Sequence, residues 1–307
     1  MRQQESSKLR TNTSGWEVRF DRRPSISDQS PDPGLFGPDS VTWKVLKEPF
    51  LVIGARLALL LQVAHPLVAQ GALDHSRYKE DPFGRFERTV AWVSQVVFGT
   101  TKEADVACQR INQIHAKVKG LMPAKYGTGP YPGGTPYSAL DPDLLLWVHA
   151  TLIYSIVVTY EKIIGCLSED EKDTLTREWN KVALRIGLTE QKLLKSWKDL
   201  LAYVSFMVLS GHAVPGEGSK EVAKTILKAH TVNPIFIGLQ ALSSFFALGL
   251  LPAMIRNGYG VRWTPLHSAC FDGLCQMLKK TINKLPEPFR SSPVYRFALE
   301  RSANTLT

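Results

Sequence analysis

The sequence predicts an all-α fold built as a single helical domain, and three observations support this prediction. Apolar residues recur at helical spacing in one stretch after another, and proline, glycine and capping residues separate the stretches. No alternating run of apolar and polar residues ends in a hairpin turn, which argues against a sheet. The 307 residues are 44% apolar and 21% charged, a composition typical of a globular chain with a sizeable core.

The N-terminal segment differs in composition from the rest of the chain. Residues 1–40 are polar and rich in Ser, Pro, Asp and Gly, with a turn signal at residues 31–34. We therefore expect a flexible arm over residues 1–40 and the helical domain over residues 41–307. No apolar secretory segment is visible at the start, and the four cysteines lack C-x-x-C spacing, so we expect a cytoplasmic protein with reduced thiols.

The expected helices follow from their start and stop signals. Pro66 should kink or restart the first apolar stretch, Gly99 should end the helix that Pro82 opens, and Thr101 should cap the next one. Residues 121–140, rich in Pro, Gly and Tyr, are expected to form a long ordered loop. The predicted helices span residues 45–73, 83–98, 101–120, 142–165, 168–187, 189–210, 220–229, 234–250 and 264–283.

Charge and hydropathy leave the cellular surroundings of the protein open. The formal net charge of +9 is spread along the chain, with no basic stripe carrying interleaved aromatics, so we expect no nucleic-acid partner. The segments 144–160 and 231–255 carry no Asp, Glu, Lys or Arg. Both are interpreted as buried helices. For the second, the alternative is peripheral contact with a membrane, aided by Arg256 and Arg262.

His115 is the first candidate for chemistry. On a helix, Cys108, Ile111, His115 and Val118 share one face, so the imidazole is expected to point into the core. A buried imidazole must be hydrogen-bonded or bound to a ligand. Two interpretations follow, namely a hydrogen-bonded core histidine or an axial ligand to a haem iron.

A second group of candidates lies in the helix that precedes His115. Arg85, Arg88 and Thr89 fall on one face of it, together with Trp92. Such a face either carries surface ion pairs or holds a carboxylate or a bound oxygen species.

Other histidines sit among apolar neighbours. His65 and His149 are interpreted as core or helix-end residues, and His65 with His75 and nearby carboxylates also permits a non-haem metal site. The H-E-x-x-H, G-x-S-x-G, Walker and G-x-G-x-x-G motifs are absent, so hydrolase, phosphoryl-transfer and dinucleotide-binding functions lack support.

Several motifs together resemble one family, the catalytic domain shared by latex clearing proteins (rubber oxygenases) and fungal MpaB-type ER-bound oxygenases. The resemblance runs from about residue 43 to about residue 263 and ends with residues 250–252 and 256–260. The motifs are, in order, residues 59–66 (LLLQVAHP), 74–76 (DHS), 84–89 (GRFERT), His115 and 145–152 (LLWVHATL).

The resemblance implies a globin-like helical core around haem b and cleavage of an isoprenoid double bond by dioxygen. By this resemblance His115 matches the proximal haem ligand, and Arg85 and Thr89 match polar residues near the haem. Arg88 stands where rubber oxygenases place a distal lysine, and His149 matches a supporting histidine of the pocket. With His65, His115 and His149 form the predicted cofactor-binding set.

The chain departs from the family pattern at two positions. An arginine fork replaces a flexible lysine at Arg88. The stretch near Gln70 that matches the acidic residue proposed as base in the rubber oxygenases has no carboxylate at the matching position, so the catalytic base is unassigned, with Glu80 and Asp81 as candidates.

The sequence thus predicts a haem b-dependent oxygenase that uses dioxygen on an apolar, isoprenoid-like small molecule. The alternatives are a haem- or lipid-binding protein without turnover and a non-haem metal enzyme using His65 and His75. The sequence does not predict the substrate or the oligomeric state.

Overall fold

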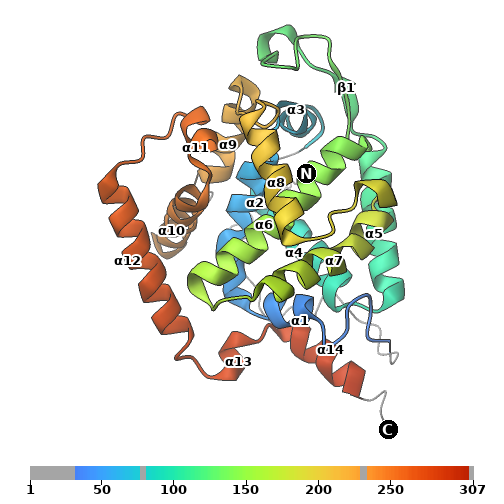
Figure 1. The fold of residues 1–307 in the computed structure, drawn as a ribbon, viewed down its shortest axis with the longest axis vertical. Helices are drawn as coiled ribbons and strands as arrows, with labels where there is room; N and C mark the ends of the chain where they lie inside the picture. The colour runs from blue at the N-terminus through green and yellow to red at the C-terminus, as the bar shows by residue number, and fades with distance from the viewer. Residues whose placement is uncertain (1–31, 77–80, 229–233, 304–307) are drawn as a thin grey trace, which may run out of the picture.

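The computed structural model describes residues 32–76, 81–228 and 234–303. The fold is all-α, as the sequence predicts, and it forms one domain with a small antiparallel hairpin of strands (Figure 1). The helices are α1 Val41–Leu46, α2 Ala55–Gln62, α3 Pro66–His75, α4 Pro82–Phe98, α5 Thr101–His115, α6 Pro142–Ile163, α7 Glu169–Arg185, α8 Trp197–Leu209, α9 Glu217–Leu227, α10 Pro234–Leu250, α11 Ala253–Gly258, α12 Pro265–Ile282, α13 Glu287–Arg290 and α14 Pro293–Ala303.

The remaining elements are short. Three 3₁₀ helices, η1 Pro49–Gly54, η2 Ala124–Tyr126 and η3 Glu190–Lys192, separate longer helices. Strand β1, Lys119–Leu121, pairs with β2, Pro136–Ser138, and together they project at the top of Figure 1. The expected ordered loop over residues 121–140 therefore holds the second strand of a hairpin and a 3₁₀ turn, and the first strand begins inside the predicted helix over 101–120, which ends at His115. Strands of three residues are too short to show an alternating pattern.

Helix α6 lies at the centre of the domain, and α2, α7, α8 and α12 pack around it (Figure 1). Its sequence is apolar on all sides, which is typical of a helix buried on all sides. By length and composition α6 could cross a membrane, but 67% of its most apolar window is buried inside the domain. The pair formed by residues 49–62 and α3 also passes this test as a unit, and it is bent by 104°.

Several predicted boundaries moved for local reasons. Pro66 restarts the chain as expected, so the predicted helix over 45–73 divides into η1, α2 and α3. Thr100 rather than Thr101 caps α5, in a capping box with Glu103. The predicted helix over 189–210 begins only at Trp197, after Ser196 as its cap. Helices α1, α11, α13 and α14 were not predicted, because their apolar periodicity is short.

Residues 32–40, which the sequence assigned to the arm, pack onto the domain. Leu35 lies in the core, and the Asp32 carboxylate accepts hydrogen bonds from the backbone and hydroxyl of Thr101 at 2.7 and 3.0 Å. Partial burial opposes ionisation of this carboxyl, but hydrogen bonds from Gly34 and Thr101 prevail and lower its pKa. Residues 1–31 of the expected arm lie outside the described residues.

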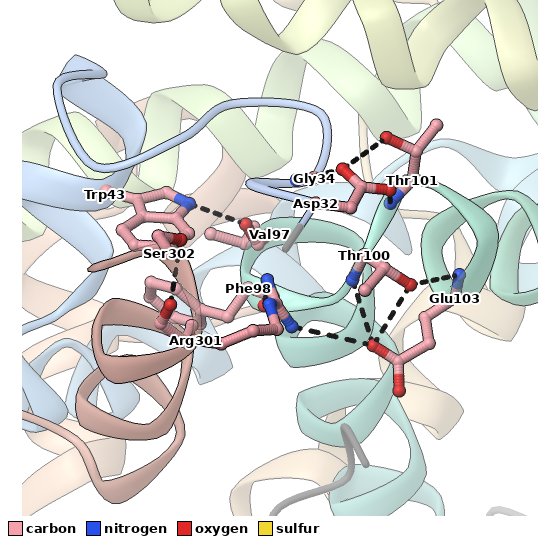
Figure 2. A network of polar contacts seen from close by, with 11 residues as sticks. Asp32, Gly34, Trp43, Val97, Phe98, Thr100, Thr101, Glu103, Arg301 and Ser302 are labelled. Atoms are coloured by element: carbon pink, nitrogen blue, oxygen red, sulfur yellow. Dashed lines mark hydrogen bonds and ion pairs between the residues drawn. The ribbon is translucent and has the colours of Figure 1, made fainter. Parts of the chain in front are cut away.

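The turn between α4 and α5 is fixed from two sides (Figure 2). Asp32 holds the start of α5 on one side. On the other, the buried Arg301 of α14 donates to the Phe98 carbonyl at 2.9 Å and approaches the Glu103 carboxylate at 3.8 Å. The two ends of the described chain thereby anchor one turn, which sets the position of both α4 and α5.

Candidate functional site

Helices α4 and α5 form an antiparallel hairpin whose open end carries most of the predicted site residues. The Trp92 indole donates to the Ala107 carbonyl at 3.2 Å, and the two residues lie equally far from the turn. The same count places Arg85 level with the last turn of α5, which ends at His115. The hairpin therefore places Arg85 and His115 at its open end.

Helix α3 closes this open end from a third side. A Cβ atom on Gly71 would lie 3.2 Å from Val118, three residues after His115. The His75 imidazole lies 3.1 Å from the Lys119 carbonyl. The second half of α3 therefore packs beside the segment that follows His115, and we call this region the α3–α4–α5 corner.

His115 is half-buried at the C-terminal end of α5. Its Nδ1 atom is buried and finds no hydrogen-bond partner among the described residues. Burial lowers the pKa of His115, so the ring is neutral at neutral pH. We expected an imidazole directed into the core, and the structure buries its Nδ1 atom while the residue as a whole is half-buried.

The three predicted polar residues of α4 differ in environment. Arg85 is half-buried. Arg88 is exposed and donates to the Asp81 carboxylate at 3.0 Å, and the same carboxylate caps α4 by accepting from Gly84. The exposed Thr89 hydroxyl donates to the Arg85 carbonyl at 3.1 Å. Arg88 and Thr89 thus stabilise the start of α4, and Arg85 is the less exposed of the two arginines on this face.

Helix α3 contributes a group of polar side chains to the corner that the sequence analysis did not identify. The buried Gln70 amide donates to Asp74 at 2.8 Å, while its Oε1 atom has no partner among the described residues. The Tyr137 hydroxyl of β2 donates to the other Asp74 oxygen at 2.5 Å. The four-residue spacing of Gln70 and Asp74 was a usable signal for their contact, but nothing in the sequence indicated Tyr137.

His149 lies in the core on α6. Its ring centroid is 6.3 Å from that of Trp179 on α7, and its Nε2 has no hydrogen-bond partner in the described part of the chain. Burial lowers the pKa of His149 to about 4, so this ring is neutral too. Among the described residues, no hydrogen bond or ring contact joins His149 to His115.

His65 is committed to protein contacts. Its Nδ1 accepts from the Leu67 backbone at 3.2 Å and so caps α3, and its Nε2 lies 2.9 Å from the Tyr131 hydroxyl. Tyr131 in turn lies 2.8 Å from Nδ1 of His212. Both ring nitrogens of His65 are therefore occupied, and burial lowers its pKa to about 3.

The non-haem alternative receives no support from this placement. His65 precedes α3 and His75 ends it, so ten residues of helix separate them by about 15 Å. No group of three or more His, Cys, Asp or Glu side chains suited to a metal ion forms among the described residues. All four cysteines are free thiols.

Sequence comparisons relate the chain to known proteins. Residues 43–280 match the family described as "ER-bound oxygenase mpaB/B'/Rubber oxygenase, catalytic domain". Two curated relatives, uncharacterised proteins of Mycobacterium bovis and Mycobacterium tuberculosis, are each 22% identical over 235 residues. The alignment covers 74% of this chain and 87% of each relative. No solved structure matches the chain at a significant level.

Proposed function

The chain belongs to the family of ER-bound MpaB-type oxygenases and rubber oxygenases, and from that premise we propose that it is a haem b-dependent oxygenase of apolar, isoprenoid-like substrates. The observation that carries the proposal is the His115 ring at the α3–α4–α5 corner. It combines burial, neutrality and a nitrogen without a partner among the described residues. An imidazole with these properties is available to an iron atom.

The donor chemistry of the corner fits haem b. His115 would be its protein ligand, and Arg85 is a cation suited to the carboxylate side chains of the porphyrin. The chemistry that haem iron supplies when bound is the activation of dioxygen. His149, the further predicted pocket residue, would support the wall of the site from α6 without binding iron.

Apolar surface beside the corner supports an apolar substrate. Ile114 is 56% exposed directly before His115, Leu121 is 63% exposed at the end of β1, and Val90 is 39% exposed on α4. Water contact at such side chains is unfavourable, and covering them with a hydrocarbon substrate would stabilise the complex. We propose that these side chains bind the substrate and that dioxygen is the second reactant.

The predicted polar residues have distinct roles in this proposal. Arg85 would orient negative charge near the reacting atoms. Arg88 and Thr89 act through α4, since Arg88 holds Asp81 at the cap and Thr89 bonds back to Arg85. For the unassigned base, Asp74 is the carboxylate that Gln70 and Tyr137 hold in place at the corner. The candidate Glu80 lies outside the described residues, and Asp81 is used as the cap of α4.

The test is the visible absorption spectrum of the purified protein, expressed with haem supplied. We expect a Soret band that disappears or shifts in His115→Ala. The matched control is His267→Ala, an exposed histidine at the start of α12, which should leave the band unchanged. A wild-type protein without a Soret band would contradict the proposal. Incubation with terpenoid alkenes and dioxygen, followed by carbonyl analysis, then tests the reaction.

A second candidate function is haem binding without turnover, and one observation favours it. The polar side chain buried on α3 at the corner is the amide of Gln70 rather than a carboxylate. If the haem-loaded protein consumes no dioxygen with any alkene offered, this second function replaces the first.

Location and membrane contact stay predictions. Cell fractionation tests the expected cytoplasmic location, and flotation with liposomes tests peripheral membrane contact. The name of the matching family includes the words ER-bound, which makes both measurements informative.

A further inference from the structure

A cleft of about 360 Å³ lies at the end of α3 opposite the α3–α4–α5 corner. Its walls come from the start of α3, the loop before β2, the start of α6 and the end of α8. This volume is at the small end of the range for small-molecule sites. The His65 ring, which lines the cleft, is not available to bind iron there, because both of its nitrogens bond to protein groups.

A chain of hydrogen bonds fixes the polar back wall of the cleft. Because Nδ1 of His65 accepts from the Leu67 backbone, the proton of this neutral ring sits on Nε2 and is donated to Tyr131. Tyr131 then donates its own proton to Nδ1 of His212. In its neutral form His212 therefore carries its proton on Nε2. The back wall is rigid, since each polar atom of Tyr131 and His65 has a defined partner.

Two carboxylates give the cleft a negative character. Asp141 caps α6 by accepting from the Asp143 backbone at 2.8 Å, and both side chains line the cleft. Among the described residues that line it, none is lysine or arginine, although the whole chain has a net charge of +9. Lys192 pairs with Asp143 from outside the lining, and that carboxylate is exposed, so screening weakens the pair.

Aromatic rings stand beside these carboxylates. Tyr131, Tyr203 and Phe206 line the cleft, and Phe206 is 59% exposed at its rim. Burial, and then the charges of Asp141 and Asp143, raise the pKa of Tyr131 to about 12. Asp141, Asp143 and Tyr131 all line the cleft, so the two carboxylates and the tyrosine ring border one space.

We propose that this cleft binds a small organic ammonium ion with an apolar body. Carboxylates attract the ammonium group, and the faces of tyrosine and phenylalanine rings stabilise a cation by their quadrupoles. The body of the ligand would contact Leu67, Leu144 and Met207, which supply the apolar part of the lining. Anions are excluded by the two carboxylates, and neutral molecules lose the charge-dependent part of the binding.

The proposal is independent of the haem hypothesis and is tested by calorimetric titration of the full chain. Phenethylammonium is the probe, with 2-phenylethanol and phenylacetate as neutral and anionic analogues of similar shape. We expect measurable binding of phenethylammonium that is about tenfold tighter than that of 2-phenylethanol, and no binding of phenylacetate. Equal heats for the amine and the alcohol, or no heat for the amine, would overturn the proposal.

Variants locate the binding in the cleft. The double variant Asp141→Asn/Asp143→Asn keeps a good cap on α6 and should weaken amine binding about tenfold or more. The matched control, Asp170→Asn/Asp272→Asn, removes two exposed carboxylates elsewhere and should leave binding unchanged. Tyr131→Phe keeps the ring and should retain most of the affinity, whereas Tyr131→Leu should lose it. Thermal denaturation of each variant confirms folding, and unchanged affinity in the folded Asp141→Asn/Asp143→Asn protein would refute the site.

Discussion

The α4–α5 hairpin has a closed end, at the turn that joins the two helices, and an open end, where Arg85 and His115 lie. The two ends differ in how their polar groups are paired. At the closed end, Asp32 and Arg301 bring charged side chains from the two ends of the described chain onto one turn (Figure 2). At the open end, His115 keeps a buried nitrogen without a partner among the described residues, and α3 contributes a second such atom on Gln70. Buried polar groups without partners cost free energy, so they mark a place where stability is not the only demand.

This difference indicates that the two ends of one pair of helices have different roles, one in stability and one in function. The closed end stabilises the hairpin and thereby sets where Arg85 and His115 lie. The open end has two buried polar atoms, on His115 and Gln70, that find no hydrogen-bond partner among the described residues. A ligand that bonds to these atoms would recover the lost free energy, which links the placement of the site to its proposed function.

The largest effect is expected at the closed end. Arg301→Met should lower the free energy of unfolding by about 4 kcal/mol, because it leaves the Phe98 carbonyl and the Glu103 carboxylate without their buried cation. Urea denaturation measures this change. The control is Arg296→Met on the same helix, whose exposed guanidinium donates to the Pro288 carbonyl and should matter by less than about 0.5 kcal/mol. Equal losses in the two variants would show that the turn is not specially anchored.

The second prediction concerns the pH dependence of the free energy of unfolding that results from burying His149. Its pKa of about 4 lies below that of an unfolded histidine, so between about pH 6.5 and pH 4 the unfolded chain binds the extra proton. Stability contributed by this group is thus complete above pH 6.5 and is lost as pH falls, by about 3 kcal/mol in total.

His149→Phe removes this titration and should reduce the pH dependence of unfolding across that window, while His65 and His115, whose pKa values are also lowered, keep their contributions. Urea midpoints measured at several pH values for wild type and variant provide the measurement. His267→Phe, at an exposed position, is the control and should keep the wild-type slope. A slope that is the same in wild type and His149→Phe would contradict a neutral, buried ring at this position.

The third prediction concerns the contact between Asp32 and Thr101 at the closed end. Asp32→Ala removes the acceptor of the Thr101 backbone and hydroxyl groups, and should cost about 1.5 kcal/mol, as expected for loss of a helix cap. Asp32→Asn should cost less, since an amide oxygen still accepts. If both variants unfold like the wild type, residues 32–40 do not support α5 in solution.

The sequence predicted the helices better than the contacts between them. Pro66 and Gly99 act within a few residues, so their effects were visible in the chain. The contact between Arg301 and the Phe98 carbonyl was not predicted, because the two residues lie 203 positions apart. Long-range pairing of this kind leaves no periodic signal, which is also why the boundary of the arm was set at residue 40.

For the candidate site, too, the sequence predicted residues within one helix better than contacts between distant segments. His115, Arg85, Arg88 and Thr89 were singled out from helical spacing, and the fold places all four on one hairpin. The chain from His65 through Tyr131 to His212 was not predicted, because it joins a cap, a loop and a turn. His65 was therefore grouped with the cofactor-binding residues, while its contacts place it in a different cleft.

The smallest expected effect provides the sharpest contrast between the two ends. His115→Leu replaces a half-buried ring, one nitrogen of which has no partner in the described structure, with an apolar side chain of similar reach. In the haem-free protein this change should raise the free energy of unfolding by about 1 kcal/mol, because no hydrogen bond is lost and a desolvated polar atom is removed. The same variant should lose the Soret band, whereas Arg301→Met, refolded in mild conditions, should keep it. A His115→Leu protein that is strongly destabilised without haem would mean that the ring holds the fold together, and the open end would then resemble the closed one.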